Sequence, residues 1–157
     1  MYNFFLIVHF LLMMIWIVSA VILDFRFLMH FRKLGDISQI GFLKSIQKVS
    51  DKTEFPASIF IILMGVLLII DHTDWLKVGI IYWKIVLALT AIGLYHASRG
   101  ILKKMILSLN SNEPVRRLAN RYIIFRLSTF VFLISIFWII IEYKGGISTI
   151  HILKSWF

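Results

Sequence analysis

The sequence predicts an all-α integral membrane protein, a bundle of four membrane-spanning helices in a single domain of 157 residues. The first reason is composition: 60% of the residues are hydrophobic, only 16% are charged, and the mean hydropathy is +0.89. The second is that the apolar residues gather in four segments, at 4–23, 55–71, 78–97 and 122–143. Each is close to the roughly 20 residues that a helix needs to cross a bilayer. Because lipid offers no hydrogen bonds to a backbone, all four segments are expected to be helices.

The composition also excludes several classes of function. The chain has no cysteine, which excludes disulfide frameworks, thiolate metal sites and covalent haem attachment. The net charge of +9 comes from basic residues in the connections between apolar segments. It therefore indicates membrane topology and lipid headgroup contact, and no nucleic-acid partner is expected. Sequence motifs of phosphate-binding loops, serine hydrolases and zinc proteases do not occur.

The first segment, 4–23, is preceded by no Lys or Arg and contains no convincing cleavage site, so it is expected to be a retained span and not a signal peptide. His9, Trp16, Leu23 and His30 follow one another at intervals of seven and therefore share one stripe of this helix. Imidazoles near both membrane faces with an aromatic wall between them are typical of a haem-binding helix in b-type cytochromes. The alternative is a packed stripe with histidines at the two interfaces.

Between the first two spans, apolar residues recur every three positions with Lys44 and Lys48 interleaved, over about 37–50. This pattern predicts a short amphipathic helix on the inner headgroup layer. The second span is the shortest, and we expect it to include Asp71.

The third and fourth helices are expected to extend beyond their spans. Apolar residues from Ile101 to Leu109 keep the helical period, and a break follows at Asn110–Pro114. The two helices should thus each reach roughly 30 residues and form an antiparallel hairpin that projects into the cytoplasm.

Basic residues predict the orientation of the bundle. Six lie in or beside the connection between the first and second spans, and six lie in or beside that between the third and fourth. The opposite side carries only Lys77, Lys144 and Lys154. By the positive-inside rule, both termini face outward and both long connections face the cytoplasm.

Two ionisable residues inside the spans are the main functional candidates, because an ionisable group in lipid is costly. His9 and Lys84 each lie about six residues into a helix that starts outside, and therefore at a similar depth. For Lys84 the alternative is a side chain that reaches the headgroups, and for His9 it is a hydrogen bond between helices.

On the third helix, Lys84, Ala88, Ala91 and Tyr95 share a face on which the alanines allow close approach of a helix or a flat cofactor. His96 follows Tyr95 at the inner boundary. Judged by depth alone, a bis-histidine site is possible at either membrane face, formed by His9 with His72 at the outer face or by His30 with His96 at the inner face.

Weaker candidates are charged or soft side chains near the span ends. Arg126 is expected to reach the interface or to pair with Asp24. Glu142 is expected to be an interfacial charge, with a pair to Lys84 or Lys144 as the alternative. Copper binding by Met13 and Met14, and metal binding by the loop Asp71–Asp74, are further alternatives.

Several of these residues resemble the motifs of a known family, the HemJ-type protoporphyrinogen oxidases and the related copper-resistance D proteins, which are small four-helix membrane proteins. The resemblance covers roughly residues 2–143. The matching positions are His9, Trp16, Arg26, His30, Lys84, Tyr95, His96, Gly100, Arg117 and Asn120.

The resemblance implies a haem b among the helices of a bacterial inner-membrane protein, with His9 as an axial ligand and Lys84 as a second ligand or a propionate partner. Trp16, His30, Tyr95 and His96 are further cofactor-binding candidates. The implied activity is redox chemistry on protoporphyrinogen or exchange of electrons with a membrane quinone. A transport, assembly or structural subunit without haem is the alternative, and association into a homo-oligomer or larger membrane complex stays open.

Overall fold

The computed structural model describes residues 2–31, 37–71, 73, 79–111 and 113–154, with side chains up to residue 139. These parts of the chain are all-helical. Helix α1 spans Tyr2–His30, a 3-10 turn η2 (Ile37–Gln39) leads into α2 (Ile40–Lys52), and α3 (Glu54–Asp71), α4 (Gly79–Asn110) and α5 (Arg116–Lys154) follow. Four helical segments are long and apolar enough to cross a membrane, and α2 and α3 together form one of these segments. The prediction of an all-α bundle with four such helices is confirmed.

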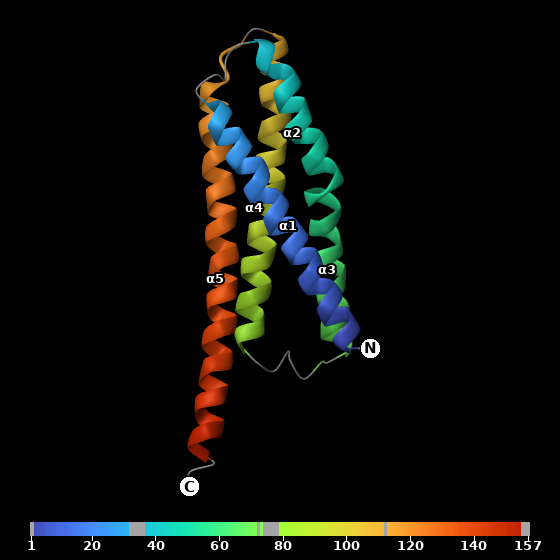
Figure 1. The fold of residues 1–157 in the computed structure, drawn as a ribbon, viewed down its shortest axis with the longest axis vertical. Helices are drawn as coiled ribbons and strands as arrows, with labels where there is room; N and C mark the ends of the chain where they lie inside the picture. Colours follow the sequence, from blue (N-terminus) through green and yellow to red (C-terminus); the bar gives the residue numbers. More distant parts are fainter. Residues whose placement is uncertain (1, 32–36, 72, 74–78, 112, 155–157) are drawn as a thin grey trace.

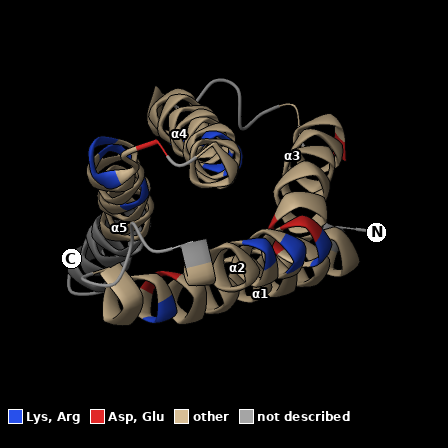
Figure 2. Ribbon diagram, turned by 90° about the horizontal axis from the view of Figure 1, so that it is seen from above, with Lys and Arg blue, Asp and Glu red and all other residues tan. Residues whose placement is uncertain are grey.

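The helices form two closely packed pairs, α1 with α3 and α4 with α5. Figure 1 shows that α1 begins and α5 ends toward the lower end of the bundle, whereas α1 ends, α2 begins and α4 turns into α5 at the upper end. Seen from above, α4 and α5 lie on one side and α1, α2 and α3 on the other (Figure 2). The predicted antiparallel α4–α5 hairpin is therefore present.

Helices α2 and α3 are nearly continuous. The backbone N–H of Thr53 donates to the Val49 carbonyl at 2.9 Å, so the helical hydrogen bonds reach the junction. Pro56 explains the break that follows, because it has no N–H to donate to the carbonyl of Lys52, four residues earlier, and its ring crowds that carbonyl. The break places Glu54 in the first turn of α3.

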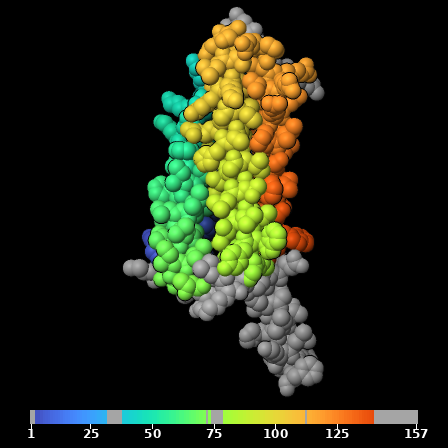
Figure 3. Space-filling view, turned by 180° about the vertical axis from the view of Figure 1, so that it is seen from behind, coloured from blue at the N-terminus to red at the C-terminus, as the bar shows by residue number. Residues whose placement is uncertain are grey.

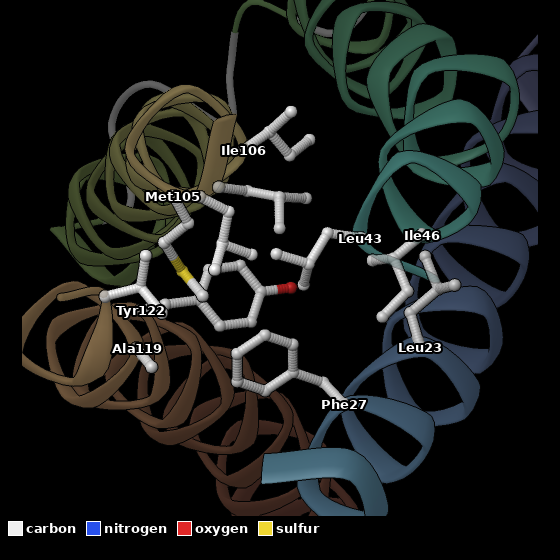
Figure 4. Close-up of a cluster of buried hydrophobic side chains, with 11 residues drawn as sticks. Leu23, Phe27, Leu43, Ile46, Met105, Ile106, Ala119 and Tyr122 are labelled. Atoms are coloured by element: carbon white, nitrogen blue, oxygen red, sulfur yellow. The ribbon is translucent and has the colours of Figure 1, made fainter. Parts of the chain in front are cut away.

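The predicted amphipathic helix exists as α2, but its apolar face lies against the protein. Leu43 and Ile46 are fully buried in a core at the upper end of the bundle, where they meet residues of α1, α4 and α5 (Figure 4). This core includes Phe27 and Tyr122, whose ring centroids are 4.4 Å apart. The prediction that this face rests on the lipid headgroup layer is wrong, because the ends of α1, α4 and α5 cover it.

Several helices are longer than the apolar segments that predicted them. Helix α1 continues past its apolar segment, 4–23, to His30, so that the stripe from His9 to His30 lies on one helix. Helix α5 runs from Arg116 to Lys154, beyond both ends of the segment 122–143. In α1 the extension has a clear cause: Leu23 and Phe27 continue its inward stripe into the upper core, and each is 1% exposed. Of the two helices expected to reach roughly 30 residues, α4 has 32, as predicted, whereas α5 is longer, with 39.

The outer surface of the bundle is apolar. Large hydrophobic side chains on α1, α3, α4 and α5 are more than half exposed, among them Phe4, Ile70, Trp83 and Trp138. A water-soluble domain rarely exposes such a continuous apolar surface, and lipid tails are its natural contact.

Candidate functional site

A cavity of about 250 Å³ lies in the lower half of the bundle, among α1, α3, α4 and α5. Its walls are almost entirely aliphatic. His9 and Lys84 are its ionisable lining residues, and Trp16 is its aromatic one. The two candidates that the sequence placed at a common depth therefore face a common cavity.

His9 projects from α1 with its Nδ1 atom buried. Among the described residues this nitrogen has no hydrogen-bond partner. The ring lies close to the backbone of α3 at Gly65, where a Cβ atom would be 3.6 Å from His9 Cε1. A buried ring nitrogen without a partner is costly unless a ligand satisfies it, so His9 is suited to bind a metal centre or a hydrogen-bonding group.

Lys84 approaches the cavity from α4 and is partly buried. Ala88, one turn along the helix, lines the same cavity, and Ala91 and Tyr95 continue the face with 0% exposure. The predicted Lys84–Tyr95 face is thus turned inward over its whole length. An amine near the imidazole of His9 adds a cation or, when neutral, a second nitrogen ligand.

The cavity is open to the outside of the bundle through the space between α3 and α4. Ile62, Val66 and Leu89 line the cavity and are also 39%, 47% and 54% exposed. In the space-filling view from this side, part of α1 is visible between α3 and α4 (Figure 3). Because the surrounding surface is apolar, a lipid-soluble molecule has a lateral route to His9 and Lys84.

Trp16 and Tyr95 connect the cavity to the upper half of the bundle. Trp16 lines the cavity and is 3% exposed, and its ring meets that of Tyr95 edge to face with centroids 5.7 Å apart. The Tyr95 hydroxyl lies 3.1 Å from Ser50 Oγ, which in turn donates to Glu54 Oε2 at 2.5 Å.

Beyond Tyr95 lies a buried group of charges that joins three helices. Arg126 on α5 donates from Nε to Asp24 Oδ1 on α1 at 2.6 Å and from Nη2 to Glu54 Oε1 on α3 at 2.7 Å. The predicted pairing of Arg126 with Asp24 is confirmed. Glu54 was missed by the sequence argument, although its place directly before an apolar segment marks it as a carboxylate at about the depth of Asp24.

The other predicted histidines lie elsewhere. His30 stacks on Phe42 with ring centroids 4.1 Å apart, and its Nδ1 is 3.0 Å from the Arg26 carbonyl. His96 meets the edge of Phe55, whose ring also carries the Arg99 guanidinium at 4.2 Å. Each imidazole thus has its own aromatic neighbour, and the structure gives His30 and His96 no contact with each other or with the cavity.

Some candidates lie outside the described residues. These are His72 and Asp74 of the connection between α3 and α4, and the side chains of Glu142 and Lys144. Met13 lines the cavity whereas Met14 is exposed, so the two do not converge on a copper site. Within the described ranges, no group of three or more His, Asp and Glu side chains is arranged to hold a metal ion.

Comparisons with family models, with curated proteins and with solved structures find no match for this chain.

Proposed function

We propose that this chain is a b-type haem protein of the bacterial inner membrane, which binds haem in the lower cavity and takes part in electron transfer. His9 would hold the iron through a ring nitrogen, and Lys84 would serve as a second nitrogen ligand or as the partner of a propionate. The observation that carries the proposal concerns His9: it lines the same cavity as Lys84, and its Nδ1 is buried without a partner among the described residues.

The residues around the cavity fit this cofactor in their chemistry. Imidazole and amine nitrogens are suitable iron ligands, and aliphatic walls match a porphyrin ring. The enclosed volume of about 250 Å³ is small for a whole macrocycle, whereas pockets that enclose drug-sized ligands begin at about 300 Å³. The opening between α3 and α4 adds space beside this enclosed volume.

Bound haem would supply one-electron transfer within the membrane. The chain's own contribution is to bind and orient. His9 fixes the centre on α1, Trp16 closes the cavity toward the upper half, and the aliphatic side chains of α3 and α4 exclude water. Lys84 can act as a ligand only when its amine is neutral, and as a propionate partner only when it is charged.

The substrate follows from the resemblance and the open side of the cavity. Protoporphyrinogen and membrane quinols are both lipid-soluble electron donors, and both could approach through the lateral opening. We assign the chain to oxidation of protoporphyrinogen or exchange of electrons with a quinone. The resemblance of His9, Trp16, Lys84 and Tyr95 to the HemJ-type pattern supports the first of these.

The test is an absorption spectrum of the detergent-purified full-length protein, as isolated and after addition of haem. We expect a Soret band, with α and β bands after reduction. His9→Ala should abolish or strongly shift these bands because it removes the axial nitrogen. His30→Ala is the matched control, since His30 lies on the same helix but stacks on Phe42 away from the cavity, and its spectrum should stay that of the wild type.

A colourless protein that binds no added haem would contradict the proposal. The chain would then be assigned to the alternative class of transport, assembly or structural subunits, in which His9 and Lys84 line a polar path or contact a partner helix.

A further inference from the structure

The buried charges of the upper half do not balance. Asp24 and Glu54 are two carboxylates, and Arg126 is the single cation to which both are bonded. If all three groups are ionised, the group carries one net negative charge. Glu54 and Arg126 are 1% and 5% exposed at their side chains, so water can offset little of this charge.

In the part of the chain that the structure describes, the neighbouring side chains supply no second positive charge. Helix α2 presents Ser50, α4 presents Tyr95, and α5 presents Tyr122 beside Arg126. Among the described residues, the only charged groups that act on Asp24 are Arg126 and Glu54. Arg99 is already paired with Asp51, with which it makes a contact of 2.6 Å.

The two carboxylates differ in how their oxygens are satisfied. Glu54 accepts from Arg126 at Oε1 and from Ser50 at Oε2, so both of its oxygens have a donor. Asp24 accepts from Arg126 at Oδ1 only, and its Oδ2 is buried without a partner in the described part of the chain. A charged oxygen that lacks both water and a donor is strongly disfavoured, whereas the same oxygen costs less in a neutral carboxylic acid.

We propose that the Asp24–Arg126–Glu54 group is a proton-binding site that holds one exchangeable proton at neutral pH, on Oδ2 of Asp24. The bound proton leaves one guanidinium opposite one carboxylate, Glu54, and removes the excess charge. Asp24 keeps 16% of its side chain exposed and lies six residues before the end of α1, so the proton exchanges with the upper side of the bundle. This proposal does not depend on haem binding and can hold or fail separately.

Infrared spectroscopy of the purified full-length protein at neutral pH tests this proposal. A protonated carboxyl group has a C=O stretching band that shifts in D₂O, whereas an ionised carboxylate has no such band. We expect the wild type to show one such band and Asp24→Asn to lose it. Asp51→Asn is the matched control: Asp51 also pairs with an arginine, but in a balanced and more exposed pair, and its loss should leave the band in place. The absence of the band from the wild type, or its survival in Asp24→Asn, would overturn the proposal.

Isotope labelling gives the same answer without a variant, should Asp24→Asn fail to fold. Carboxyl-¹³C aspartate should shift the band to lower frequency, and carboxyl-¹³C glutamate should leave it unchanged. A shift with labelled glutamate would place the proton on Glu54 and contradict the assignment to Asp24.

Discussion

The Arg126 side chain is 5% exposed, so water does little to solvate its charge. Asp24 and Glu54 compensate that charge instead. The pairing of Arg126 with Asp24 could be predicted from the sequence. Asp24 follows the C-terminal end of the first span and Arg126 lies near the N-terminal end of the fourth, so both are expected near the same side of the membrane. The depth of Glu54 could also be read from the sequence, but its burial could not, since a carboxylate at the edge of an apolar segment is ordinarily solvated. The tertiary structure brings Ser50 of α2 and Arg126 of α5 to the Glu54 carboxylate, which is buried there.

Arg126→Gln should lower the free energy of unfolding by about 3–5 kcal/mol, because it leaves buried carboxylate charge without a cation. Arg99→Gln is the comparison, since the Arg99–Asp51 pair is 19% and 34% exposed at its side chains and should contribute only about 1 kcal/mol. Circular dichroism monitors the unfolding of the wild type and of both variants in detergent, and gives the loss of unfolding free energy for each variant. Equal losses in the two variants would show that burial of the Arg126 pairs contributes nothing extra.

Substitution of Lys84 by Met tests whether this residue binds the cofactor or only packs in the membrane. Lys84→Met keeps the length of the side chain and removes its charge, so insertion should stay intact or improve, by roughly 2–3 kcal/mol on the translocon scale. If Lys84 contacts the cofactor, this variant should retain less haem than the wild type, measured by the Soret absorbance per protein. Haem content equal to that of the wild type would mean that Lys84 only reaches the headgroups.

Lys84→Arg distinguishes the two cofactor roles. A guanidinium cannot lose its proton and so cannot bind iron, but it holds a carboxylate at least as well as an ammonium does. Loss of haem in both variants indicates ligation, and rescue by Arg indicates a propionate or substrate carboxylate. Wild-type behaviour in both would leave His9 as the one ionisable cavity residue with a functional role.

Among the helices, α2 shows what periodicity can and cannot predict. The spacing of Leu43 and Ile46 predicted a helix with one apolar face, and that helix is present. The contacts of this apolar face could not be predicted, because a face that packs on a protein core and a face that lies on lipid consist of the same apolar residue types. The extension of α1, α4 and α5 beyond the lengths expected from their apolar segments provides the core that covers α2.

Leu43→Ala should therefore destabilise the bundle by about 2–5 kcal/mol, the cost of a cavity in a closed core. Leu107→Ala removes the same atoms from α4, where the side chain is 65% exposed, and should cost much less. Thermal unfolding of the two variants in one detergent compares them directly. If α2 rested on a headgroup layer instead, both substitutions would have small and similar effects.

For the whole molecule, the number and type of helices followed from hydropathy, and the α4–α5 hairpin followed from the break at Asn110–Pro114. The pairing of α1 with α3 did not follow, because α1 packs more closely on α3 than on α2, its neighbour in sequence. The cavity follows from this arrangement, because it lies where the two pairs meet. His9 and Lys84 could be placed at one depth by counting residues, yet only the packing of α1 and α4 around the same space brings them together.

The orientation of the bundle in the membrane is predicted by its charges. Exposed basic residues gather at the upper end, on α2, α4 and the start of α5 (Figure 2), and the positive-inside rule places this end in the cytoplasm. Reporter fusions after Gly35 and Ser111 should therefore behave as cytoplasmic, with green fluorescent protein fluorescent and alkaline phosphatase inactive. A fusion at Phe157 should show the opposite pair of signals, because α5 runs back to the end at which α1 begins. A fluorescent fusion at Phe157 would overturn this orientation and would place the cavity, with His9 and Lys84, near the inner face.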